Sequence, residues 1–177
     1  MSTFALDQIH QQLPEALVER YVDRAGDAWG VIKPEHIPHV AKLLKERLGF
    51  RMFISMDGVD RLHLPPEEQE PRFEVLYFLR NVERNELVRL KVRVAEGAEV
   101  HSIRSIFQGA NWGERFVWDF YGVPFKGHGD LRRILMYEEF KGHALRKDYP
   151  LRGRQGLMPE RPLKDIFRGP GTNGVAD

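Results

Sequence analysis

Apolar residues in the first fifty positions recur at the spacing of amphipathic helices. Leu6, Ile9 and Leu13 predict a short helix that ends at the proline following them. Residues 33–49 predict a second helix, because prolines stand near its start and a glycine follows its last apolar position. Its apolar face consists of Val40, Leu43, Leu44 and Leu48. Residues 29–33, between the two helices, are typical of a short strand.

After residue 50 the period of the apolar positions changes from about 3.6 to 2, which indicates strands. Residues 51–56 predict one strand, and residues 73–82 and 87–94 predict two longer strands joined by a tight polar turn. The residues expected on one face of the first strand are Met52, Ile54 and Met56. In the last strand valines and a leucine alternate with Arg and Lys, so one face should meet a core and the other water or a partner.

Helical spacing returns beyond residue 100. Residues 101–108 predict a short helix, and residues 111–122 predict a longer one with Asn111 as its N-cap. The second helix carries an aromatic stripe, which we expect to pack the helix onto the domain. The stripe consists of Trp112, Phe116 and Phe120. Residues 141–177 are rich in Gly, Pro and Arg without an apolar period, and we expect them to be disordered or extended over another protein.

Together these elements predict an α+β fold, with helices packed on a small mixed or antiparallel sheet and a long irregular C-terminal tail. We expect an α+β domain over residues 1–125, which includes the short helices at 101–121. Residues 126–177 would form an extended tail that wraps a partner.

Composition and charge narrow the possible functions. The 177 residues include no cysteine, which removes disulfides, thiolate metal sites and a cysteine nucleophile. The net charge of +1 argues against general nucleic-acid binding, although residues 126–177 hold 11 Lys and Arg against 7 Asp and Glu and hint at an acidic partner. No apolar run approaches the roughly 20 residues that cross a bilayer, and the N-terminus lacks the basic region of a secretion signal. A cytoplasmic location fits this composition.

The densest polar segment, residues 114–135, matches no catalytic motif. Its acids and His128 have no spacing that fixes metal ligands on one element, and it contains no complete phosphate-binding glycine motif. Arg115 and Asp119 are four residues apart, so we predict an ion pair between them within the helix. Arginines next to aromatic residues favour an interface, because the guanidinium group binds carboxylates and stacks on rings.

The segment ERFVWDFYGVPFKGHGDLRRIL resembles the signature of the 30 kDa subunit of bacterial respiratory complex I, NADH:quinone oxidoreductase. The positions that match are Glu114, Arg115, Asp119, Phe120, Tyr121, His128, Arg132, Ile134 and Leu135. The flanking ANW and GHALRKDYPL are also similar to the family, and the likeness spans roughly residues 30–155. Three positions depart from the family pattern: Phe116, where Glu is usual, and Gly129 and Ala144, where Pro is usual.

The resemblance implies an α+β domain whose tail wraps the 49 kDa subunit of that enzyme, next to the quinone-reducing module. It implies no catalytic residue and no cofactor in this chain, because partner subunits bind the FMN, the iron–sulfur clusters and the quinone. The chain would then be peripheral on the cytoplasmic side of the cell inner membrane and attached through the complex, which moves protons. The residues we expect at the partner interface are His128, Arg132, Arg133, Arg146, Lys147 and Asp148.

Two alternatives stay open at this point. The chain could be the equivalent subunit of a related membrane-bound hydrogenase or ferredoxin-linked complex. More remotely, it could be a stand-alone hydrolase or a nucleic-acid-binding module.

Overall fold

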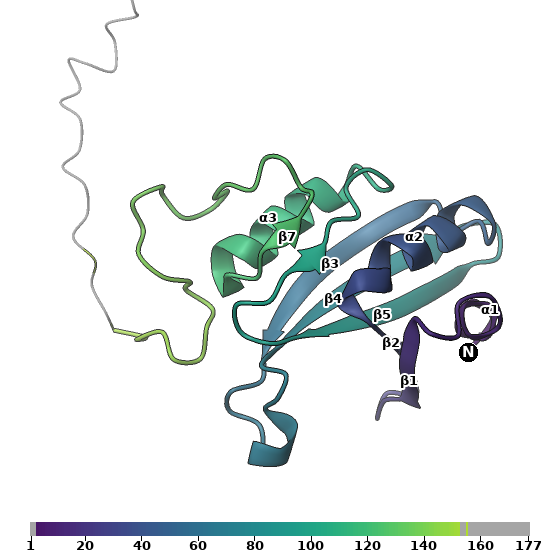
Figure 1. Cartoon of the computed structure of the whole chain (residues 1–177), viewed down its shortest axis with the longest axis horizontal. Helices are drawn as coiled ribbons and strands as arrows, with labels where there is room; N and C mark the ends of the chain where they lie inside the picture. The colour runs from purple at the N-terminus through teal and green to yellow at the C-terminus, as the bar shows by residue number, and fades with distance from the viewer. Residues whose placement is uncertain (1–2, 153–154, 156–177) are drawn as a thin grey trace, which may run out of the picture.

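A computed structural model of the chain describes residues 3–152 and 155. These residues form an α+β fold, as the sequence predicts (Figure 1). The elements in chain order are α1 (Phe4–Gln12), β1 (Leu17–Val22), β2 (Ala28–Ile32), η1 (Pro34–His36), α2 (Ile37–Glu46), β3 (Met52–Asp60), η2 (Pro66–Glu68), β4 (Phe73–Asn81), β5 (Glu86–Val94), β6 (Val100–His101), α3 (Ala110–Tyr121) and β7 (Phe125–Lys126). The proposed division of the chain after residue 125 stays a prediction.

Five strands form a mixed sheet in the order β1-β2-β5-β4-β3. Within this sheet β2 and β5 run parallel, and the other neighbours are antiparallel. Strands β6 and β7 pair in parallel in a separate two-stranded sheet. The predicted hairpin is β4 and β5, paired in register from Phe73–Val94 to Asn81–Glu86. Asn81 closes the turn, because its side chain accepts the Arg84 amide and donates to the Leu48 carbonyl. This second bond ties the hairpin to the end of α2.

The helices lie against one face of the sheet, with α3 on β3 and α2 next to α1 (Figure 1). The core under them includes the alternate residues of β4 and β5 that the period of two predicts. On the other face of β5, Arg89, Lys91 and Arg93 form ion pairs of 2.9–3.0 Å with carboxylates of neighbouring strands and turns. No described helix covers this charged face.

Two elements differ from the expectation. Residues 17–22, whose alternation is weak, form β1 because they pair with β2 along the sheet edge. Residues 101–108 are not a helix: they contribute β6 and a turn in which the Phe107 amide donates to the Ile103 carbonyl at 2.8 Å. The Ser102 hydroxyl and the Ile103 amide bind the Glu114 carboxylate, which holds this turn against α3.

Strand β3 is longer than predicted and its inward face is different. A bulge between Phe53 and Ser55 shifts the register by one residue. Met52 and Ile54 therefore point outward and are 48% and 42% exposed, while Met56 remains buried. The expected face of Met52, Ile54 and Met56 was wrong for this reason.

Helix α3 packs on β3 through small residues and not through its aromatic stripe. A Cβ at Gly58 of β3 would lie 2.5 Å from the Tyr121 ring, and one at Gly113 would lie 2.8 Å from Met56, so the two elements are in close contact at both points. Trp112 is 61% exposed, and Phe116 and Phe120 are only half-buried. Phe116 nevertheless packs against the core, as expected, so the expectation that the aromatic stripe packs the helix onto the domain was wrong for Trp112. The N-cap is Gly109, not Asn111, which lies inside the helix.

Candidate partner interface around helix α3

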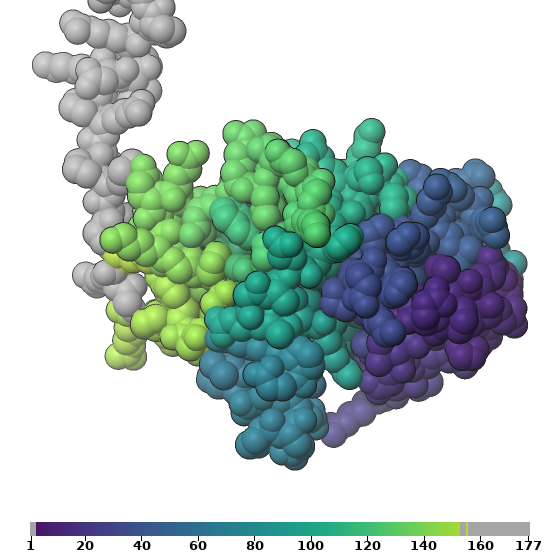
Figure 2. All heavy atoms as spheres, viewed as in Figure 1, coloured from purple at the N-terminus to yellow at the C-terminus, as the bar shows by residue number. Residues whose placement is uncertain are grey.

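The chain that follows α3 folds back over the C-terminal end of the helix. Figure 2 shows residues 122–152 covering the end of the molecule that lies opposite the N-terminal helix. The last carbonyl groups of a helix have no partner within it, and positive side chains near them are stabilising. His143 bonds to the Asp119 carbonyl at 2.9 Å, and Arg146 donates to the Tyr121 carbonyl at 2.6 Å. The returning segment thus caps the helix.

Asp119 holds the next part of this segment. Its buried carboxylate accepts hydrogen bonds of 3.0–3.1 Å from three consecutive amides, those of Ile134, Leu135 and Met136, and bonds to the Arg133 guanidinium at 2.6 Å. Burial would raise the pKa of Asp119, but the amides and Arg133 outweigh burial and lower it. The carboxylate is therefore charged and fixes the backbone path beyond residue 133.

Arg115 is buried and donates to the carbonyls of Arg132 and Arg133, both at 2.9 Å. The predicted ion pair between Arg115 and Asp119 was therefore wrong. The two side chains face the same way on the helix, as their spacing requires, but each binds the returning segment instead of the other. The spacing of residues within one helix carries no information on this segment, which follows about 15 residues later in the chain.

Glu114 holds the turn before the helix. It is fully buried and accepts hydrogen bonds from the Ser102 hydroxyl at 2.5 Å and from the Ile103 amide at 2.7 Å. Burial raises the pKa of Glu114 to about 7, and these hydrogen bonds oppose the rise only in part. His128 Nε2 lies 3.9 Å from the carboxylate.

His128 is itself buried and bonded within the chain. Its Nε2 bonds to the Asn111 carbonyl at 3.2 Å, and its Nδ1 accepts the Asp130 amide at 3.2 Å. Burial lowers the pKa of His128, so the ring is neutral at pH 7 and Nε2 carries the proton. In this arrangement His128 fixes the loop after β7 against the start of α3.

The motif Arg146-Lys147-Asp148 is attached to the end of the sheet. Asp148 pairs with Arg72 at 2.9 Å, and the Lys147 amide donates to Asp60 at 2.8 Å. Arg146 pairs with Glu96 at 2.9 Å. Because Arg72 also binds Asp60 and Glu96, with Nη–O distances of 3.0 and 2.8 Å, one guanidinium group joins three carboxylates.

The six residues expected at a partner interface therefore fall into two groups. His128, Arg133, Arg146 and Asp148 have their polar groups bonded within the chain. The Arg132 side chain is 68% exposed and, within the described residues, pairs only with Asp130, at 3.1 Å. Lys147 is exposed and bonds through its amide. Whether a partner meets them stays a prediction.

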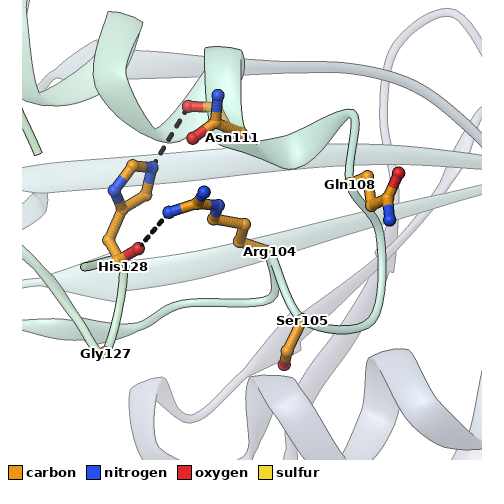
Figure 3. A pocket seen from close by; sticks show the side chains of 6 residues that line it. All are labelled: Arg104, Ser105, Gln108, Asn111, Gly127 and His128. Carbon is orange, nitrogen blue, oxygen red and sulfur yellow. Dashed lines mark hydrogen bonds between the residues drawn. The ribbon is translucent and has the colours of Figure 1, made fainter. Parts of the chain in front are cut away.

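Sequence reasoning missed the exposed aromatic residue of this region and the hollow beside it. The exposed stripe on α3 begins at Trp112, and Arg115 stacks under its ring with 5.0 Å between the guanidinium carbon and the ring centroid. An open hollow of about 550 Å³ reaches the start of α3 at Asn111, the residue before Trp112 in the chain (Figure 3). It is lined by Arg104, Ser105, Gln108, Asn111, Gly127 and His128. The signal available in the sequence was a tryptophan close to arginines, but we expected the whole stripe to pack the helix onto the domain.

Two further observations concern only residues 3–152 and 155. Within them no group of three or more His, Asp and Glu residues is placed to hold a metal ion. None of the helices there combines the length and the apolar character needed to span a bilayer.

Residues 31–155 match the family model described as respiratory-chain NADH dehydrogenase, 30 Kd subunit. The chain belongs to this family. It is 42% identical over 166 residues to an NADH-quinone oxidoreductase subunit of Paramagnetospirillum magneticum, covering 93% of this chain and 81% of the relative. It is 40% identical over 129 residues to the subunit of the same name in Geobacter metallireducens, covering 72% and 77% of the two chains.

Two solved structures share the fold. A trypsin-resistant fragment of Nqo5 (residues 1–134) has the same fold, with a TM-score of 0.63 and 24% identity over 72% of this chain and all of the fragment. A chain of an archaeal membrane-bound sulfane sulfur reductase matches with a TM-score of 0.55 and 27% identity, covering 69% of this chain and 68% of the other.

Family membership gives a structural meaning to the departures in the signature. Gly129, where the resemblance led us to expect proline, has a φ of +80°, which a proline cannot adopt. Phe116 stacks against Phe120 with ring centroids 4.9 Å apart on the half-exposed side of α3. It adds apolar surface where the family usually has a carboxylate.

Proposed function

We propose that this chain is a non-catalytic structural subunit of the peripheral arm of a proton-translocating NADH:quinone oxidoreductase. The observation that carries the proposal is the match of residues 31–155 to the 30 kDa subunit family, together with relatives at about 40% identity that are named as subunits of that enzyme. The geometry supports a structural role, because the acids and arginines of residues 114–135 bind backbone groups and hold the returning segment.

In this proposal the chain docks on the 49 kDa subunit, beside the quinone-reducing module. Arg132 and Lys147 expose their side chains and can meet that partner, while the bonded residues hold the backbone in position for docking. Partner subunits bind the FMN, the iron–sulfur clusters and the quinone. Membrane attachment, on the cytoplasmic side of the cell inner membrane, comes through the complex.

The likeness to a chain of a sulfane sulfur reductase supports a second candidate, the equivalent subunit of a related membrane-bound complex. The two candidates share this fold and differ in the electron donor and acceptor of the whole complex. The relatives at 39–42% identity, all named for NADH oxidoreductases, favour the first candidate.

The test is purification of the tagged full-length chain from detergent-solubilised membranes of its host, with identification of the proteins that accompany it. We expect a large complex that contains the 49 kDa subunit and reduces quinone with NADH. An untagged strain carried through the same steps is the control. Recovery of the chain alone, or with a complex that oxidises hydrogen or ferredoxin but not NADH, would contradict the proposal.

A further inference from the structure

The exposed face at the start of α3 has the features of a docking site. We call it the Trp112 surface and define it as the hollow lined by Arg104, Ser105, Gln108, Asn111, Gly127 and His128, together with Trp112, Lys126 and Arg132. Hydrogen bonds and ring contacts connect these parts. His128 bonds to the Asn111 carbonyl, Arg104 donates to the His128 carbonyl at 2.6 Å (Figure 3), and Arg115 links the Trp112 ring to the Arg132 carbonyl.

The Trp112 ring is exposed and held in place by contacts within the chain. Its side chain is 61% exposed, although tryptophan is usually largely buried in a folded protein. The Arg115 guanidinium under the ring is itself held by two backbone carbonyls, so the ring rests on a fixed support. Exposed aromatic residues with restricted motion are common centres of protein interfaces, because they contribute area at a small entropy cost.

The hollow beside Trp112 is polar and positively charged. Arg104 donates one N–H group to the His128 carbonyl, and its other guanidinium N–H groups have no hydrogen-bond partner in the described part of the chain. Lys126 and Arg132 are exposed nearby, and the Asp130 carboxylate pairs only with Arg132. The side-chain oxygen of Asn111 is buried in the wall without a hydrogen-bond partner. The hollow therefore offers the N–H donors of Arg104 to a carboxylate.

We propose that the Trp112 surface docks an acidic segment of a neighbouring subunit, with an apolar residue of that segment on the Trp112 ring and a carboxylate in the hollow against Arg104. Charge complementarity selects this occupant, because neither Arg104 nor Lys126 forms an ion pair within residues 3–152 and 155. The inference rests on the proposed function, which supplies the neighbouring subunit. It shares His128 and Arg132 with the interface expected above and adds Trp112 and the hollow to it.

The first experiment places the photoreactive amino acid p-benzoylphenylalanine at position 112 of the tagged chain in intact membranes. Position 82, where Val82 is 64% exposed in the turn between β4 and β5, receives the same probe as a control. We expect position 112 to cross-link to a peptide of another subunit that carries Asp or Glu within a few residues, and position 82 not to reach that peptide. Cross-links confined to this chain, or to a segment without acids, would overturn the inference.

The second experiment measures retention of the chain in the purified complex. We expect Trp112→Ala to lower retention about tenfold or more, as for a central aromatic contact. We expect Arg132→Glu to lower retention as well, and its effect should grow as the salt concentration is reduced, because salt screens the repulsion between the new glutamate and the acidic segment. Val82→Ala and Arg24→Glu change an exposed apolar and an exposed basic residue elsewhere, and should leave retention unchanged. Circular dichroism of each full-length variant verifies that it folds.

The outcomes separate the two proposals. If the wild-type chain does not copurify with NADH:quinone activity, the proposed function fails whatever the variants do. If the wild-type chain is retained and Trp112→Ala and Arg132→Glu are retained equally well, the proposed function stands and the docking site is refuted.

Discussion

Glu114 illustrates how a single buried residue can hold a local fold and make it depend on pH. Its carboxylate fixes the turn at Ser102 and Ile103, and its pKa in the folded chain is about 7, compared with 4.5 for an ordinary glutamate. The folded state therefore binds the proton more tightly than the unfolded state. The resulting stability is complete below about pH 4.5 and is lost as the pH rises through 7.

We predict that Glu114→Gln removes this pH dependence. A shift from 4.5 to about 7 corresponds to a difference on the order of 3 kcal/mol between pH 4 and pH 8. The variant should therefore gain stability relative to wild type as the pH rises, because the glutamine amide has no charge to bury. Urea unfolding of both chains at several pH values between 5 and 8 measures the difference. Glu138→Gln, at an exposed position, is the control, and a difference that stays constant with pH would contradict the prediction.

At the scale of elements, the position of α3 depends on a close approach to β3 that the sequence of the helix does not predict. Helical spacing predicted the helix itself, and its observed end, Gly122 in the left-handed conformation, agrees with the predicted boundary. The side that faces the sheet was predicted only in part, because Phe116 of the aromatic stripe packs against the core but Trp112 is exposed. The close contact with β3 uses Gly58 and Gly113, which let the helix approach the strand more closely than larger residues would.

We predict that Gly58→Ala destabilises the chain by about 1–3 kcal/mol, the usual cost of overpacking, because the new methyl group collides with the Tyr121 ring. Combining it with Tyr121→Ala should recover part of the loss, since the second change removes the colliding ring. Urea unfolding of the two single variants and the double variant gives the coupling energy. Additive effects of the two substitutions would show that the ring does not set the cost.

At the scale of the whole molecule, Arg72 joins segments that lie far apart in the sequence. It binds Asp60 at the end of β3, Glu96 after β5 and Asp148 in the returning segment. Asp60 is fully buried and also accepts the Lys147 amide. This cluster fixes residues 146–148 at the end of the sheet, and so determines where the chain leaves the domain.

We predict that Glu96→Gln loosens this attachment without unfolding the domain. Glu96 is half-exposed and pairs with Arg72 and Arg146, so its loss should change the free energy of unfolding by less than about 1 kcal/mol. Local opening should nevertheless raise the rate of tryptic cleavage after Arg146 and Lys147 roughly two- to fivefold. Glu19→Gln removes a similar half-exposed pair with Arg93 on the other sheet face and serves as the control. Equal cleavage rates in the two variants would exclude the role assigned to Glu96.

The sequence alone determined the features that depend on neighbouring positions. Apolar periods of 2 and 3.6 predicted the alternation of β5, the apolar face of α2 and the hairpin of β4 and β5. The signature at residues 114–135 identified the family. These patterns are local, because each position constrains residues only a few places away. They carry no information on which distant group a buried charge will meet.

The tertiary structure alone decided which partners the charged residues have. Asp119 binds amides 15–17 residues away, and Asp60 binds the Lys147 amide 87 residues away. A polar residue near a partner-binding motif looks the same in sequence whether it faces that partner or its own backbone. Burial decides between the two, because a buried charge must find its hydrogen bonds within the fold, whereas Trp112 and Arg132 remain exposed.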